Sequence, residues 1–182
     1  MKSSAAKMSY DLYRLLPDDG KRYELIDGEL MMMTPAPTPQ HQRILKQLGF
    51  QLSAFVEANG LGEVFIAPVD IVLEDHTVVE PDILFVSRER RGIVREEAIH
   101  GAPDVVVEIL SPSSFYHDLR RKMALYSQFG VQEYWIVDPE KQSIDLYVRA
   151  GNELKLSRQF ASHETFESPL LGGFRLAVSA IF

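Results

Sequence analysis

Pro103-Asp104-Val105-Val106-Val107-Glu108-Ile109-Leu110 is an apolar run of strand length that carries a carboxylate near its end. Because side chains alternate along a strand, Glu108 shares one face with Asp104, Val106 and Leu110. An ionised carboxylate in apolar surroundings is costly unless it is paired, hydrated or bound to a metal. The sequence therefore predicts a strand in which Glu108 has a partner elsewhere in the chain.

A second carboxylate stands before another strand-forming run. Glu80-Pro81-Asp82 leads directly into the β-rich segment Ile83-Leu84-Phe85-Val86. One interpretation is a strand-start Asp82 that hydrogen-bonds its own backbone. The other is that Asp82 and Glu108 end neighbouring strands and point into one cleft, where each would raise the pKa of the other unless a divalent cation held both ionised.

Oxygen ligands favour a hard cation such as Mg²⁺ or Mn²⁺, and the chain contains no cysteine to offer sulfur. Such a cation lowers the pKa of a bound water and stabilises charge at a phosphorus centre, while a nearby lysine orients the nucleophile or meets the developing charge. The chemistry indicated by this pairing is phosphodiester hydrolysis.

The surrounding pattern predicts a mixed α/β (α+β) domain with a central sheet and two main helices. One amphipathic helix follows the Pro-rich residues 34–39 and runs to about residue 58, and the other covers 115–129 after a turn and cap at 111–114. Asp27-Gly28 predicts a hairpin between two strands. A short helix is expected at 11–16, and strands at 22–26, 29–33, 64–73 with a break at Pro68, 83–86, 134–137, 144–148 and 153–160.

Two further side chains are candidates for the same site. Glu24 lies between Tyr23 and Leu25 in the first strand, where it is either solvated on an outward face or a site carboxylate. His41 precedes Ile44 by three residues and so lies on the buried stripe of its helix, as a packed core residue, a local cap or a site residue.

Two further groups of polar residues have more than one interpretation. Arginines at positions 88, 90, 91 and 95 form either a solvated face or a phosphate contact. Asp118, Lys122 and Tyr126 lie four residues apart on one face of the second helix, a spacing typical of exposed ion pairs.

The composition is that of an ordinary globular domain. The chain has 182 residues, of which 46% are hydrophobic and 25% charged, and a formal net charge of −7, which argues against a broad basic surface but not against a local basic cleft. We expect a loose terminus over residues 1–9 and a single domain over 10–182. No apolar run long enough to span a membrane is present, so we expect a cytoplasmic protein.

Several ordered segments resemble the Uma-two family of candidate endonucleases, within the PD-(D/E)xK nuclease superfamily. The resemblance rests on residues 23–29, His41, 80–82, 107–113 and 134–139. It implies a restriction-endonuclease-like core, a mixed β-sheet flanked by helices, over 10–182. It also implies that Asp82 and Glu108 bind metal, assisted by the backbone carbonyl of Ile109.

The chain departs from the superfamily pattern at one position. The lysine of E-x-K would fall at position 110, on the same face as Glu108, but this residue is Leu110. The Uma-two resemblance implies a migrated lysine from the following helix, Lys122, and brings Glu24 and His41 into the site.

The leading hypothesis is a Mg²⁺-dependent (or Mn²⁺-dependent) endonuclease that hydrolyses phosphodiester bonds in DNA. One alternative is a catalytically inactive nuclease-fold module that binds nucleic acid or protein, and another is a purely structural buried ion network. A homodimer is expected because duplex cleavage needs two cuts and because Trp135 and Phe182 could cover one another between copies.

Overall fold

The computed structural model describes residues 7–33, 37–111 and 116–182, with side chains from residue 119 onward in the last range. The turn and cap predicted at 111–114 lie mostly outside the described residues, as does the side chain of Asp118. Within the described residues, no helix combines the length and apolar character needed to cross a membrane.

A six-stranded mixed sheet forms the centre of the molecule, in the order β11-β10-β9-β8-β6-β3. Strands β8 and β9 are parallel, and the other neighbours are antiparallel. The strands are β3 (Gly62–Ile66), β6 (Ile83–Ser87), β8 (Val105–Ile109), β9 (Glu133–Asp138), β10 (Ser143–Ala150) and β11 (Glu153–Ala161). The predicted mixed sheet flanked by helices is confirmed.

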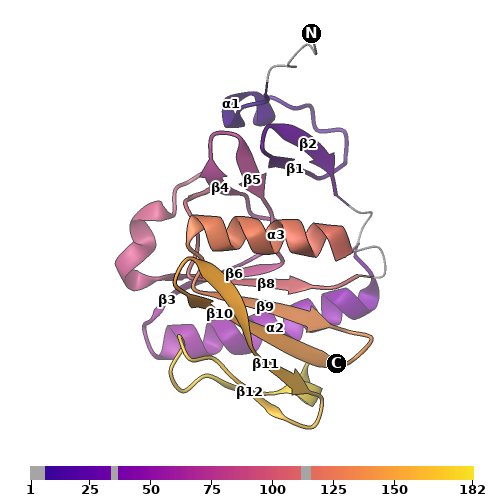
Figure 1. Cartoon of the computed structure of the whole chain (residues 1–182), viewed down its shortest axis with the longest axis vertical. Coiled ribbons are helices and arrows are strands. Elements are labelled where there is room, and N and C mark those ends of the chain that lie inside the picture. Colours follow the sequence, from indigo (N-terminus) through magenta and orange to yellow (C-terminus); the bar gives the residue numbers. More distant parts are fainter. Residues whose placement is uncertain (1–6, 34–36, 112–115) are drawn as a thin grey trace.

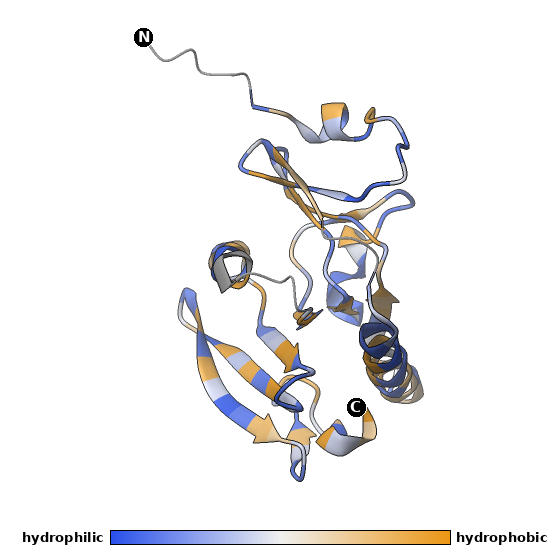
Figure 2. Cartoon of the chain, turned by 90° about the vertical axis from the view of Figure 1, so that its right-hand side faces the viewer, coloured by the Kyte–Doolittle hydropathy of each residue, from blue (hydrophilic) through white to orange (hydrophobic). Residues whose placement is uncertain are grey.

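Two helices cover opposite faces of this sheet (Figures 1 and 2). The apolar stripe of α2 (Pro39–Ala58) packs with Val105, Val107 and Ile109. The other face packs against α3 (Tyr116–Phe129), and there Val106 belongs to the same cluster as Tyr126. The alternation along β8 therefore decides which side chains face each helix, and it turns Glu108 toward α3.

A second, five-stranded sheet lies beside α3, in the order β2-β1-β5-β4-β7 (Figure 1). Its strands are β1 (Tyr23–Ile26), β2 (Glu29–Met32), β4 (Ile71–Glu74), β5 (Thr77–Val79) and β7 (Ile99–His100), and α1 (Tyr10–Tyr13) packs beside them. The hairpin turn has positive φ at Asp27 and Gly28, as a tight hairpin turn between twisted strands requires. The predicted break near Pro68 separates β3 in the central sheet from β4 in this one.

The C-terminal residues cover the α2 side of the central sheet. They form β12 (Thr165–Glu167), β13 (Arg175–Ala177) and the short helix η2 (Val178–Ala180). Trp135 is completely buried there, 4.6 Å from Phe166 and 5.9 Å from Phe174 between ring centroids. The suggestion that Trp135 faces a second copy is therefore wrong, because its own chain already covers it.

The arginine cluster lies at the far end of β6 from Asp82. It falls in and after the short helix η1 (Arg88–Ile93), which follows the last residue of a five-residue strand spanning roughly 17 Å. Arg90 donates to Asp104 Oδ1 at 3.0 Å and to the carbonyl of Ala102 at 2.6 Å. These arginines are thus separated from the predicted site residues, and Arg90 ties η1 to the segment before β8.

Candidate functional site

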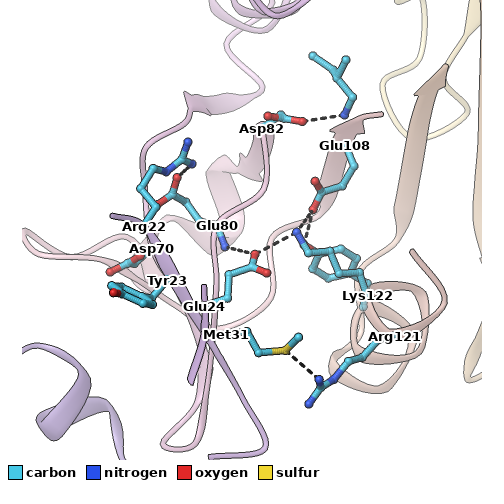
Figure 3. A network of polar contacts seen from close by, with 12 residues as sticks. Arg22, Tyr23, Glu24, Met31, Asp70, Glu80, Asp82, Glu108, Arg121 and Lys122 are labelled. Atoms are coloured by element: carbon cyan, nitrogen blue, oxygen red, sulfur yellow. Dashed lines mark hydrogen bonds and ion pairs between the residues drawn. The ribbon is translucent and has the colours of Figure 1, made fainter. Parts of the chain in front are cut away.

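Asp82 and Glu108 meet at one end of the central sheet. The antiparallel register of β6 and β8 pairs Ile83 with Val107, so one further step places Asp82 opposite Glu108. The Oδ2 atom of Asp82 accepts a hydrogen bond from the backbone N–H of Ile109 at 2.7 Å (Figure 3). Two acids that are distant in the sequence therefore lie at the same sheet end.

Glu108 points toward α3 and meets two donors from that helix. Its Oε1 atom lies 3.1 Å from Lys122 Nζ and accepts a hydrogen bond from the hydroxyl of Tyr126 at 3.1 Å. Burial raises the pKa of Glu108 to about 8; Lys122 lowers this pKa, whereas Asp82 and Glu24 raise it. Glu108 also raises the pKa of the buried Tyr126, after the larger effect of burial.

Glu24 reaches the site from the second sheet. It is 5% exposed, and its Oε1 atom lies 3.0 Å from Lys122 Nζ. The same oxygen accepts a hydrogen bond from the backbone N–H of Glu80 at 3.0 Å. The ammonium of Lys122 therefore bridges Glu108 of the central sheet and Glu24 of β1 (Figure 3). Of the two interpretations of Glu24, a solvated outward face is wrong.

His41 joins the site from the first turn of α2. The helix begins at Pro39, and the side chain of Thr38 accepts a hydrogen bond from the backbone N–H of His41 at 3.2 Å. The buried His41 Nε2 lies 3.2 Å from Asp82 Oδ1. His41 Nδ1 is also buried and has no hydrogen-bond partner among the described residues. His41 thus fixes the oxygen of Asp82 that Ile109 does not bind.

Several supporting residues were not predicted from the sequence. Arg22, which is partly exposed, forms an ion pair with the buried Glu80. Arg121 donates to Met31 Sδ at 2.8 Å and approaches the carbonyl of Ile26 at 3.3 Å. Only Tyr126 had a signal in the sequence, since it follows Lys122 by four residues. Arg22 and Arg121 act across contacts between elements, which no local pattern encodes.

The charges of this site fit a divalent cation. Glu108 and Glu24 both contact the ammonium of Lys122, and Asp82 lies at the same sheet end, so two negative charges are unbalanced when all three carboxylates are ionised. The raised pKa of Glu108 has this excess as one of its causes. The described residues contain no group of three or more acidic or histidine side chains already arranged around a metal position. Mg²⁺ commonly uses only one or two carboxylates, completed by water and substrate phosphate, so the paired acids suit it.

The structure brings together Asp82, Glu108, Lys122, Glu24 and His41 from five different elements or their flanks. Ile109 is also present, but the observed contact is made by its N–H, and its carbonyl as a metal ligand stays a prediction. Leu110 packs against the apolar cluster on the α3 side. The ammonium near Glu108 is therefore supplied by α3 and not by position 110.

The mixed sheet between two helices, with acids at one end, places the chain among proteins with a nuclease fold. A family model named Uma2 and described as "Putative restriction endonuclease" matches residues 10–179. The chain belongs to the Uma2 family.

A solved structure shares this fold. It is described as "a putative nuclease belonging to DUF820" from Anabaena variabilis, and it is 22% identical in sequence with a TM-score of 0.79. The match covers 96% of this chain and 97% of the other. No curated protein matches the chain.

Proposed function

We propose that the protein is a Mg²⁺-dependent endonuclease that hydrolyses phosphodiester bonds in DNA, with Mn²⁺ able to replace Mg²⁺. The observation that carries this proposal is the charge pattern of the site, where Asp82, Glu108 and Glu24, once all are ionised, outnumber the ammonium of Lys122 by the charge of one divalent cation. Membership of the Uma2 family and the likeness to a nuclease fold support it.

Asp82 and Glu108 would hold the metal, with the carbonyl of Ile109 assisting. Their side chains are 17% and 12% exposed, so they are the site carboxylates most open to solvent. A bound Mg²⁺ would supply a water of lowered pKa and a positive charge beside the phosphate. His41 and the N–H of Ile109 each bind one oxygen of Asp82, and together they orient its carboxylate.

Lys122 would act at the scissile phosphate. Hydrolysis forms a bond from the water oxygen to phosphorus and breaks the bond from phosphorus to the leaving oxygen, which ends with a proton. Negative charge grows on the phosphate oxygens along this path, and a fixed ammonium stabilises it more than mobile water does. Glu108 and Glu24 hold Lys122 Nζ within 3.1 Å and so fix this charge in place.

A catalytically inactive nuclease-fold module is the second candidate. It is favoured by Leu110 in the place of the expected lysine and by the engagement of Lys122 with both Glu24 and Glu108, which resembles a structural ion network. The two candidates differ in one property, since only the endonuclease gains activity when a divalent metal is added.

Nicking of supercoiled plasmid DNA tests the proposal. We expect cleavage with Mg²⁺ or Mn²⁺, none with a chelator, and loss of cleavage in Asp82→Ala and Glu108→Gln. Glu153→Gln is the matched control because Glu153 is an exposed carboxylate whose only described ion pair is at 3.8 Å with Lys155. Equal residual activity in wild type and Asp82→Ala, with normal folding of both, would contradict the assignment and favour the inactive module.

The proposal extends to the assembly. One such site cuts one strand, so cleavage of duplex DNA calls for two copies, and we propose a homodimer. Sedimentation velocity at several protein concentrations measures this directly. A monomer at all concentrations, with and without DNA, would rule the homodimer out while leaving single-strand nicking intact.

A further inference from the structure

We propose that Glu24 is a positioning residue that holds Lys122, and that it is not a ligand of the metal. This inference rests on the proposed function and assigns separate tasks to the three carboxylates of the site. Asp82, in the bend before β6, lies opposite Glu108 of β8, whereas Glu24 belongs to the second sheet.

The ammonium of Lys122 lies between Glu24 and Glu108. It is 3.0 Å from Glu24 Oε1 and 3.1 Å from Glu108 Oε1, and the side chain of Lys122 is 5% exposed. Asp82 has no such contact with Lys122 among the described residues, and binds His41 and Ile109 instead. The ammonium of Lys122 thus already occupies the space between Glu24 and Glu108. The space between Asp82 and Glu108 is the one left for a metal ion.

Glu24 is itself fixed by the chain segment that carries Asp82. The backbone N–H of Glu80 donates to Glu24 Oε1, the same oxygen that binds Lys122. A metal ion at this oxygen would lie close to both the ammonium and a positively polarised N–H, which opposes its binding in a buried site. The donors around Glu24 therefore suit an acceptor of hydrogen bonds better than a metal ligand.

The neighbouring residue of α3 reinforces this contact. Arg121 reaches the same hairpin as Glu24 and donates to Met31 Sδ on β2 and to the carbonyl of Ile26 on β1. Two consecutive side chains of α3 thus contact one β-hairpin, Arg121 at the sulfur of Met31 and Lys122 at the buried Glu24 (Figure 3). The β1–β2 hairpin therefore helps to position the ammonium of Lys122.

Calorimetric titration of the full chain with Mn²⁺ alone separates a metal ligand from a positioning residue. In Glu24→Gln we expect the Kd for Mn²⁺ to stay within about twofold of wild type, whereas in Glu108→Gln it rises by more than the roughly tenfold that loss of a hydrogen-bond partner of a ligand already costs. Glu29→Gln is the control, because it neutralises a carboxylate of the same hairpin that lies 3.9 Å from Arg121 and is 79% exposed. This measurement needs no variant of the buried lysine.

Cleavage kinetics complete the test. Misplacing a catalytic group lowers the reaction rate by up to about 10²-fold, so Glu24→Gln should lower kcat by about tenfold or more and leave KM unchanged. In a Lys122→Met background the same substitution should change the residual rate by less than about twofold, because the group it positions is gone.

Three results would overturn the inference. Weakening of Mn²⁺ binding in Glu24→Gln as large as in Glu108→Gln would make Glu24 a ligand. An unchanged kcat in Glu24→Gln, or an effect of equal size with and without Lys122, would remove the link between them. If wild type neither binds Mn²⁺ nor cleaves DNA, both the proposed function and this inference are wrong. If wild type does both, the results on the variants test the role of Glu24 alone.

Discussion

The carboxylate of Asp82 and the backbone N–H of Ile109 are joined by a 2.7 Å hydrogen bond. This bond connects the bend before β6 to the last residue of β8, immediately after Glu108. It fixes one oxygen of Asp82 by a backbone group that every residue except proline offers at position 109. The position of Asp82 is therefore set by the sheet itself.

Asp82→Asn and Asp82→Ala should differ in stability but not in metal binding. An asparagine oxygen can still accept from Ile109, whereas alanine leaves that N–H without its acceptor, which costs about 1–3 kcal/mol. Both substitutions remove the charge and should weaken Mn²⁺ binding by about tenfold or more. Urea denaturation and calorimetric titration measure the two effects. Equal stability of the two variants would show that this hydrogen bond does not contribute to the free energy of unfolding.

The metal-free protein should lose stability as the pH rises toward 8. Burial raises the pKa of Glu108 to about 8 in the folded chain, while its ordinary value is 4.5. Between these values the folded state keeps a proton that the unfolded state has lost, so the free energy of unfolding falls with rising pH, by at most about 1.4 kcal/mol per pH unit for one proton.

Urea denaturation in the presence of a chelator, from pH 5 to pH 9, measures this slope. Glu108→Gln carries no titrating group at this position and should show a flatter profile over the same range. Parallel profiles for wild type and Glu108→Gln would mean that Glu108 is already ionised in the metal-free fold.

Stabilisation by Mg²⁺ should increase with pH over the same interval. The metal binds the ionised carboxylate, so at pH 6 it must displace the proton that the raised pKa of Glu108 retains. Below about pH 8 the apparent affinity should rise by at most about tenfold per pH unit for one released proton, and the shift in Tm at fixed Mg²⁺ should rise with it. A Tm shift that is the same at pH 6 and pH 8 would show that binding releases no proton.

The sequence was most informative where a polar residue interrupts an apolar pattern. Glu108 stands within a strand of valines, and the alternation along that strand correctly placed Val106 and Val105 on different faces. The two long helices were predicted because their apolar periodicity is strong over many turns. These features are local, so a single segment contains all the information that they need.

The second sheet was not predicted as a separate unit, because its strands have only two to four residues each and its two hairpins are joined by β1–β5 and β4–β7 pairings between distant parts of the sequence. Glu24 was left between two interpretations for the same reason. Its burial depends on Lys122, which lies on a different element and is far away in the sequence. Contacts of this kind follow from tertiary packing and leave no periodic signal.

A buried acid far from the candidate site offers a separate test of the fold. Glu133 is 1% exposed and accepts hydrogen bonds from Trp135 Nε1 at 2.9 Å, from Ser168 Oγ at 2.7 Å and from the N–H of Leu170 at 2.7 Å. These contacts tie the C-terminal segment to the start of β9. All three partners are donors, so the site calls for an acceptor at both oxygens.

Glu133→Gln should destabilise the chain by about 1–3 kcal/mol, because the amide NH₂ of glutamine must face a donor where a carboxylate oxygen accepted. Ser168→Ala removes one of the three donors and also the hydroxyl that accepts from the N–H of Leu171 at 2.9 Å, so it should destabilise the chain by a similar amount. Urea denaturation monitored by the fluorescence of Trp135, the only tryptophan, measures both. Because Glu133 does not contact the acids around Lys122, Mn²⁺ binding by the folded variant should stay unchanged; weakened binding would show that the C-terminal segment supports the site as well as the sheet.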